Sequence, residues 1–209
     1  MQVIAIDGPA ASGKSSVARH VANRLGWLYV NTGNMYRAIT WAALDAGFDL
    51  KESDAIAAYA DAVKLEFITE PNKHITMLTN GHALTDAELN TEAVNAAVSL
   101  IAQVPEVRTR LVNEQRALAK RGPLVMEGRD IGSVVFPDSP HKFYIDASET
   151  VRAARRKQQG LNDAVGLRDK LDSTRKTAPL VVPEGAAHID SSDMTLDQVV
   201  EKVLSMINI

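Results

Sequence analysis

The chain has 209 residues and no cysteine, with 45% hydrophobic and 23% charged residues, a net charge of -3 and a pI of about 6.0. The composition is that of a globular protein, and the length is enough for one sizeable core. The acidic balance argues against a broad nucleic-acid surface. The lack of cysteine excludes disulfides and thiolate chemistry. No apolar run approaches the ~20 residues of a membrane span and no secretory leader is recognisable, so we expect a cytoplasmic protein with no membrane partner.

The first third of the chain alternates between strand and helix patterns. A β-branched run at 3–6 predicts a buried parallel strand, and a Gly-rich turn then leads into a helix at about 14–25 with one apolar face. Residues 27–30 predict a second strand and residues 33–46 a second helix. Ser53 can cap a short helix that follows.

The middle of the chain changes character. Two β-rich runs at 64–68 and 75–78 precede Asn80-Gly81, a strong signal for a two-residue hairpin turn, with 83–84 on the return strand. This antiparallel pattern interrupts the strand–helix alternation. We therefore expect a small insert at about 58–104.

The alternation then resumes with a helix that begins at Pro105 and ends near Arg121. Ser148 can cap a basic helix, and Thr195 with Gln198 forms a capping-box pattern before the last helix. Three further strands are predicted, at 124–126, 143–145 and 187–190. Alternating strands and helices predict a three-layer α/β fold with a mostly parallel sheet.

A phosphate-binding loop lies between the first strand and the first helix. It fits the pattern G-x-x-x-x-G-K-[ST], in which glycines let backbone N–H groups wrap around phosphates at a helix N-terminus. Lys14 can reach the β- and γ-phosphates, and the hydroxyl of Ser15 can bind Mg²⁺. The motif consists of Gly8, Pro9, Ala10, Ala11, Ser12, Gly13, Lys14 and Ser15, and Ser16 follows it. It predicts a bound nucleoside triphosphate.

Arginines follow two of the predicted strands. Arg37 comes after the second strand and Arg129 after the strand at 124–126, and ligands bind at these strand ends in open α/β sheets. A site that holds ATP beside a second phosphate needs several cations, and arginine binds phosphate through a planar, permanently charged fork. Further arginines lie toward the C-terminus, at Arg152, Arg155, Arg156, Arg168 and Arg175. The pattern indicates phosphoryl transfer.

A phosphate acceptor needs no general base, because its second pKa of ~6 leaves its oxygen largely ionised at neutral pH. Catalysis then depends on positioning and charge stabilisation. A sugar or alcohol acceptor would more often recruit a carboxylate base, for which Asp7 and Asp130 are available.

Tyr36 precedes Arg37 directly, and Gly128-Arg129-Asp130-Ile131-Gly132 opens a distinctive segment that runs to Asp138. With these stretches the chain resembles the bacterial cytidylate kinases over nearly its whole length. The segment from Gly128 to Asp138 and the pair Tyr36-Arg37 carry most of the specificity. The matching stretches are Ile6-Asp7-Gly8-Pro9 through Lys14-Ser15-Ser16, Thr32-Gly33-Asn34-Met35-Tyr36-Arg37, Val94-Asn95-Ala96-Ala97, Glu127-Gly128-Arg129-Asp130 through Asp138, and Arg175 with Ala178-Pro179-Leu180.

The resemblance implies that the γ-phosphoryl of ATP, with Mg²⁺ as cofactor, is transferred to CMP or dCMP. It also implies a single kinase domain with a five-stranded parallel core. That core would comprise 1–57, 105–151 and 171–209, with a monophosphate-binding insert at 58–104 and a short helical lid at 152–170. ATP and CMP or dCMP are the only partners expected, and we expect a monomer.

The resemblance also assigns roles to individual residues. Lys14, Arg129 and Arg175 would be catalytic, and Arg152 and Arg156 would bind ATP together with the phosphate loop. The acceptor would be held by Thr32, Tyr36, Arg37, Ser99, Arg108, Arg129, Asp130, Arg168, Asp172 and Arg175. Among these, Ser99, Arg108 and Asp130 would read cytosine, Asp172 would bind the ribose, and the other arginines would hold the phosphate.

Two features depart from the family pattern. Asn31 and Asn34 stand where the family usually has Asp and Ala, and the stretch 157–167 is shorter than the usual lid. The nearest alternatives are kinases for UMP, AMP or shikimate, against which Ser99, Arg108 and Asp130 favour cytosine. An ATP-driven switch is a further alternative, but we find no convincing Walker-B carboxylate or water-orienting residue for it.

Overall fold

The computed structural model describes residues 2–50, 53–70, 73, 75–158, 160, 165–175 and 177–207. It divides into two compact units: the first contains the chain up to Asn31 and from Leu118 onward, and the second spans Thr32–Ala117. The second unit contains the expected insert, 58–104, and extends beyond it on both sides. Within the part of the chain that is described, no helix combines the length and the apolar character needed to cross a membrane.

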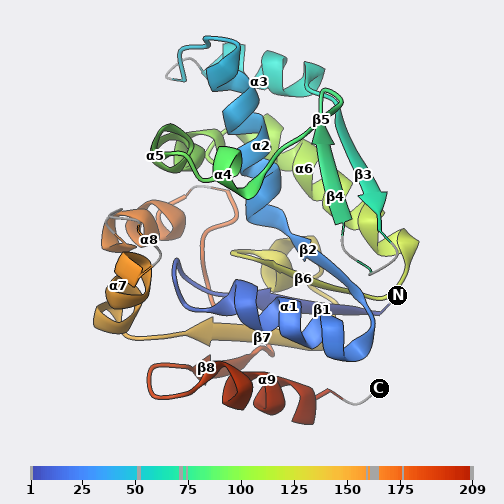
Figure 1. Ribbon diagram of the computed structural model, residues 1–209, viewed down its shortest axis with the longest axis vertical. Coiled ribbons are helices and arrows are strands. Elements are labelled where there is room, and N and C mark those ends of the chain that lie inside the picture. The colour runs from blue at the N-terminus through green and yellow to red at the C-terminus, as the bar shows by residue number, and fades with distance from the viewer. Residues whose placement is uncertain are drawn as a thin grey trace. The chain divides into compact units, whose positions relative to one another are not determined.

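A parallel five-stranded sheet forms the centre of the first unit, with strand order β2-β6-β1-β7-β8. The strands are β1 (Val3–Asp7), β2 (Leu28–Asn31), β6 (Leu124–Gly128), β7 (His141–Asp146) and β8 (Ala187–Asp190). Every residue of β1 and β6 is buried, as expected for continuous apolar strands in the middle of a parallel sheet. This sheet confirms the predicted parallel core (Figure 1).

Helices of the first unit pack on this sheet and at the ends of its strands. They are α1 (Lys14–Leu25), α7 (Glu149–Gln158), α8 (Val165–Ser173) and α9 (Leu196–Ser205). Val17 and Val21 of α1 and Val199 of α9 join one apolar cluster with Ile4 and Ile6 of the central strand. Beyond the end of β7, α7 packs against α8 (Figure 1).

The second unit combines helices with a separate antiparallel sheet in the order β3-β4-β5. Its elements are α2 (Thr32–Asp45), α3 (Ser53–Ala62), β3 (Leu65–Thr69), β4 (Ile75–Thr79), β5 (His82–Ala83), α4 (Asp86–Leu89), α5 (Glu92–Ile101) and α6 (Pro105–Leu118). Its core contains Met35 and Ile39 of α2, Ile101 of α5 and Leu111 of α6. The small antiparallel sheet was predicted.

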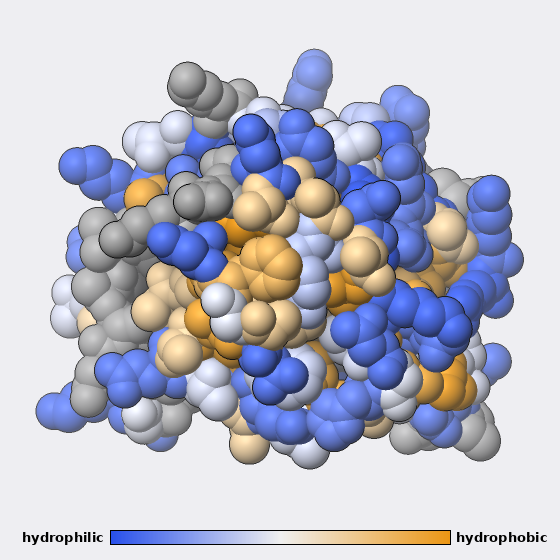
Figure 2. All heavy atoms as spheres, turned by 90° about the horizontal axis from the view of Figure 1, so that it is seen from above, coloured by the Kyte–Doolittle hydropathy of each residue, from blue (hydrophilic) through white to orange (hydrophobic). Residues whose placement is uncertain are grey.

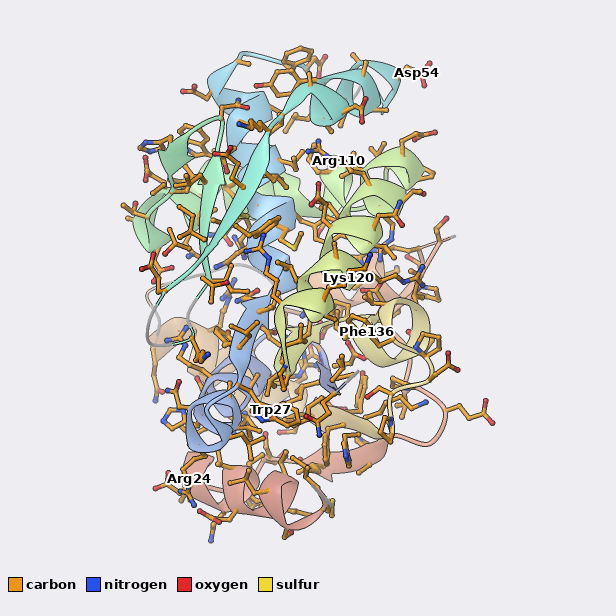
Figure 3. All side chains as sticks on the ribbon, turned by 90° about the vertical axis from the view of Figure 1, so that its right-hand side faces the viewer. Arg24, Trp27, Asp54, Arg110, Lys120 and Phe136 are labelled. Carbon is orange, nitrogen blue, oxygen red and sulfur yellow. The ribbon has the colours of Figure 1, made fainter. Side chains whose placement is uncertain are left out.

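Two local features hold the second unit together. Asn80 and Gly81 have φ values of 51° and 81°, the positive pair that a tight hairpin turn requires. Arg110 projects from α6 toward the end of α3, where its guanidinium donates to the carbonyls of Ala60 and Val63 (Figure 3). Helix C-termini leave carbonyls without intrahelical partners, and a cation there is favourable.

The face of the molecule on which α3 lies in Figure 1 is shown from above in Figure 2. Apolar residues gather near its centre, and hydrophilic side chains surround them. Within the second unit, Phe48 and Tyr59 form a half-buried aromatic pair whose ring centroids are 4.3 Å apart. The hydroxyl of Tyr59 donates to the carbonyl of Ala42, which ties this pair to α2.

Several elements lie outside what the sequence predicted. The sequence analysis gave no bounds for α4 or α5 and did not predict the π-helical turn at Ile131–Val135. Helix α8 begins within the predicted helical lid, 152–170, and extends beyond it to Ser173. The helix expected to reach Arg121 ends at Leu118 and continues as a single 3₁₀ turn, Ala119–Arg121. The capping role predicted for Ser53 rests on a side chain outside the described residues.

Candidate functional site

The phosphate loop leaves β1 in a conformation that only glycine permits at its first position. Gly8 has φ 154°, and a Cβ on it would lie 2.0 Å from the carbonyl oxygen of Ile145 in β7. Gly13 has φ 90° and precedes α1, whose N-terminus carries no side-chain cap. The first N–H groups of α1 are therefore available to an anion, to which the helix dipole is also favourable.

Two polar side chains of the loop are buried within it. Lys14 is 5% exposed, and its Nζ donates to the carbonyl oxygen of Pro9 at 3.0 Å. The hydroxyl of Ser12 is buried and has no hydrogen-bond partner among the described residues. A buried hydroxyl without a partner is costly, so the loop is well suited to a polar ligand that approaches Ser12.

A cavity of about 520 Å³ opens beside the loop. Arg155 crosses its wall, donating to the carbonyl oxygen of Ser12 at 3.0 Å and to that of Ser191 at 2.8 Å. The lining residues are Ala11, Ser12, Gly13, Lys14, Ser15, Ser16, Val17, Arg155, Arg156, Gln158, Ser191, Met194, Leu196 and Val199. Arg156, predicted to bind ATP, is thus brought to the phosphate loop.

Arg152 was also predicted to bind ATP, but it does not line this cavity. Its Nε donates to the carbonyl of Ala147 at 2.9 Å, and its Nη1 donates to the carbonyl of Ala10 at 3.2 Å. It also forms an ion pair with Asp169. Its guanidinium therefore holds the backbone of the phosphate loop at Ala10 and does not face the cavity.

A second arginine cluster is formed by Arg129, directly after β6, and Arg175, just after α8, around Asp172 of α8. Arg129 Nε donates to Asp172 Oδ2 at 2.8 Å, and Arg175 pairs with the other oxygen of the same carboxylate. Burial alone would lower the pKa of the Arg129 guanidinium, but the charge of Asp172 outweighs it and the pKa is raised. Three predicted site residues are thus brought together, while the side chain of Arg168 lies outside the described residues.

Asp7, at the end of β1, holds the loop that contains Asp130. Its two carboxylate oxygens accept from the backbone N–H groups of Ile131 at 2.8 Å and Gly132 at 2.7 Å. Asp7 is completely buried and Asp130 is 5% exposed. Both oxygens of Asp7 have a structural task, which argues against the alternative in which it serves as a base for an alcohol acceptor.

The remaining predicted residues lie in the second unit, on α2, α5 and α6. Arg37 donates from Nη1 to the carbonyl of Leu89 at 3.0 Å and to Asn95 Oδ1 at 2.8 Å, which fixes its direction. The guanidinium of Arg108 lies 5.5 Å from the ring centroid of Tyr36, a cation–π contact.

Arg108 is 2% exposed, and its Nη1 donates to the carbonyl of Ala102 at 3.1 Å. Thr32 and Ser99 are buried as well. The second unit therefore gathers buried polar and cationic side chains on three of its helices.

Comparison with known proteins decides the family. The model of the family described as "Cytidylate kinase" matches residues 4–209. The chain belongs to the cytidylate kinase family. The cytidylate kinase of Geobacillus kaustophilus is 41% identical, over 98% of this chain and 96% of its own, and that of Mycobacterium avium is 42% identical, over 98% and 94%. A gluconokinase structure from Sinorhizobium meliloti superposes with a TM-score of 0.46 at 16% identity, over 98% of this chain and 90% of its own. This similarity is too low to indicate a function.

The phosphate loop and the cavity beside it fit a nucleoside triphosphate. The uncapped α1 N-terminus, the buried Ser12 hydroxyl and the adjoining Arg156 suit a polyanion. The described residues include no group of three or more His, Asp or Glu side chains that could hold a metal.

The sequence did not predict one wall of the cavity beside the phosphate loop. Ser191, Met194 and Leu196 lie just after β8, at the carboxyl end of the strand. The rule that pointed to Arg37 and Arg129 applies there equally. The segment was overlooked because it carries no cationic side chain. Its apolar side chains, Met194 and Leu196, would suit contact with a nucleobase.

Asp7 should make the stability of the protein depend on pH. Burial raises the pKa of its carboxyl from 3.8 to about 7, although the N–H groups of Gly132 and Ile131 and the charge of Lys14 oppose this, and Asp130 adds to it. Between pH 3.8 and about pH 7 the folded chain holds a proton on Asp7 that the unfolded chain has lost, so the free energy of unfolding falls as pH rises. The free energy of unfolding of the wild type, minus that of Asp7→Asn, should fall by about 1.4 kcal/mol per pH unit in this range.

Urea unfolding of both proteins at several pH values between these limits measures that difference. A difference that stays constant with pH would show that Asp7 remains ionised in the folded state.

Proposed function

We propose that this protein transfers the γ-phosphoryl group of ATP to CMP or dCMP, forming ADP and CDP or dCDP. The observation that carries the proposal is the full-length match to the cytidylate kinase family, in a chain whose phosphate loop has the geometry described above. Family membership makes the protein a kinase.

On the donor side, the phosphate loop, Gly8 to Ser16, binds the triphosphate through its N–H groups, and Lys14 leaves the carbonyl of Pro9 to reach the β- and γ-phosphates. Arg156 contacts ATP from the cavity wall, whereas Arg152 acts on it through Ala10. Ser15 is the protein ligand proposed for Mg²⁺, which neutralises charge on the phosphates when it is bound.

On the acceptor side, Arg129 and Arg175 bind the acceptor phosphate while Asp172 holds them in place, and Arg37 and Arg168 complete its cationic environment. A cytosine edge offers an amino donor and ring acceptors, which a carboxylate and a guanidinium match. The proposed cytosine ligands are Ser99, Arg108 and Asp130, the ribose ligand is Asp172, and Thr32 and Tyr36 line the pocket.

The chemistry needs little beyond positioning and charge. The attacking phosphate oxygen is already largely ionised at neutral pH, so no residue has to remove a proton. Arginines that stabilise the transferring phosphoryl group account for the rate enhancement. We further propose that the chain works as a cytoplasmic monomer on small molecules only. The proposed division is a core (1–57, 105–151, 171–209), a monophosphate-binding insert (58–104) and a lid (152–170).

A coupled ADP-release assay with Mg-ATP tests the proposal by offering CMP, dCMP, UMP, AMP and GMP separately at equal concentration. We expect rapid turnover with CMP and dCMP and none with the purine nucleotides. Rapid turnover with AMP or UMP alone would assign a different acceptor. Rates equal to the acceptor-free rate for all five would contradict the kinase assignment and favour an ATP-driven switch.

A further inference from the structure

Asp169, in the middle of α8, reaches the phosphate loop. Its Oδ1 accepts from the backbone N–H of Ala10 at 3.1 Å, and its Oδ2 pairs with Arg152. Arg152 in turn donates to the carbonyl of Ala10. Both main-chain polar groups of Ala10 are therefore bound by side chains from α7 and α8, the two helices that follow β7.

The ion pair between Arg152 and Asp169 is largely shielded from solvent. The side chains of Arg152 and Asp169 are 10% and 17% exposed, unlike the exposed ion pairs that contribute little to stability. Asp169 is also close enough to Arg129 to raise the pKa of its guanidinium. The carboxylate thus lies between a donor-binding loop and an arginine proposed to bind the acceptor.

The same helix holds that arginine cluster. Asp172, three residues after Asp169 and therefore on the same side of α8, pairs with Arg129 and with Arg175. The first carboxylate attaches α8 to the loop that binds ATP, and the second attaches it to the arginines that face the acceptor phosphate. One turn of α8 therefore links the two groups of ligands.

We propose that Asp169 is a positioning residue that sets the alignment of donor and acceptor phosphates by fixing α8 to Ala10 of the phosphate loop. The inference rests on the proposed function of the phosphate loop and of Arg129 and Arg175. Asp169 itself contacts neither phosphate.

The consequence for catalysis follows from how sharply phosphoryl transfer depends on geometry. A misplacement of about 1 Å can cost 10²-fold in rate, while each substrate is still bound by its own contacts. Loss of Asp169 removes the acceptor of the Ala10 N–H and the partner of Arg152, but it removes no side chain proposed to bind phosphate. The phosphate loop and the Asp172 arginine cluster are then no longer joined through α8. The effect should therefore fall on kcat rather than on KM.

The test compares Asp169→Asn and Asp169→Ala with the wild type. The asparagine retains an oxygen for the N–H of Ala10 but loses the ion pair with Arg152, and the alanine loses both. Lys170→Ala, at the exposed neighbouring position of α8, is the matched control. The measurements are kcat, the KM values for ATP and CMP, the dissociation constant of each nucleotide alone by calorimetry, and the thermal unfolding midpoint.

We expect kcat to fall about 10- to 100-fold in Asp169→Ala and less in Asp169→Asn. The KM values and dissociation constants should stay within about threefold, and Lys170→Ala should match the wild type. A kcat within about threefold of wild type in Asp169→Ala would overturn the proposal. So would a loss confined to ATP binding, which would limit the role of Asp169 to supporting the phosphate loop, or failure of both variants to fold, which would make its role structural. Inactivity of the wild type toward CMP would instead contradict the proposed function.

Discussion

Replacing Arg129 with alanine is expected to lower kcat for CMP phosphorylation by about 10²- to 10³-fold, the usual cost of removing one preorganised group that stabilises transition-state charge. The fold should survive, because Asp172 keeps its ion pair with Arg175. Arg129→Lys should recover only part of the activity, since an ammonium group cannot bind phosphate through two parallel N–H groups. Steady-state kinetics together with circular dichroism measure both parts of this prediction.

Arg24→Ala is the matched control. Arg24 pairs with Glu201 at 2.9 Å on the surface of the same unit, and both side chains are 60% exposed, so the substitution should leave kcat unchanged (Figure 3). Arg129→Ala with kcat within threefold of wild type would remove Arg129 from the acceptor-phosphate site.

Gly8→Ala is expected to cost about 4 kcal/mol or more of stability and to abolish ATP binding. The added Cβ would meet the carbonyl oxygen of Ile145 at 2.0 Å, and φ 154° is itself a backbone conformation that L side chains rarely adopt. Ile145 cannot move aside easily, because it is fully buried in β7 and β7 pairs with strands on both sides. Urea unfolding and calorimetric titration with ATP measure the two effects.

Gly26→Ala separates backbone strain from collision. Gly26 ends α1 with φ 65°, but no atom lies within 4 Å of a Cβ placed there, so we expect a loss of only about 1 kcal/mol and normal ATP binding. Equal losses in the two variants would mean that the contact with Ile145 does not restrict the loop.

Elements with a complete local signal were predicted well. The phosphate loop carries both its motif and its helix, and α1 begins and ends where expected, at Lys14 and Leu25. The Thr195–Gln198 capping box is present, and Asn80-Gly81 forms the hairpin turn. In each case the determining interactions lie within a few residues of one another, so they can be read from sequence.

Other features depend on contacts between distant residues. Asp169 lies 159 positions from Ala10 and 43 positions separate Asp172 from Arg129, so no local pattern indicates either contact. Family resemblance pointed to Asp172 but not to Asp169. One miss was avoidable, because Thr85 and Glu88 form a capping box at the start of α4 that a search for such pairs would have found.

The sheet topology also has a consequence for how the chain acquires its structure during synthesis. Val3 of β1 pairs with Leu124 and Ile4 pairs with His141, so the central strand has no partner until more than half of the polypeptide has been made. The segment Thr32–Ala117, by contrast, is continuous and is complete before either partner strand appears. Because domains fold in the order in which they emerge and distant pairings form slowly, we expect this segment to fold first. Strand β1, which leads into the phosphate loop, can pair only after β6 and β7 have been synthesised.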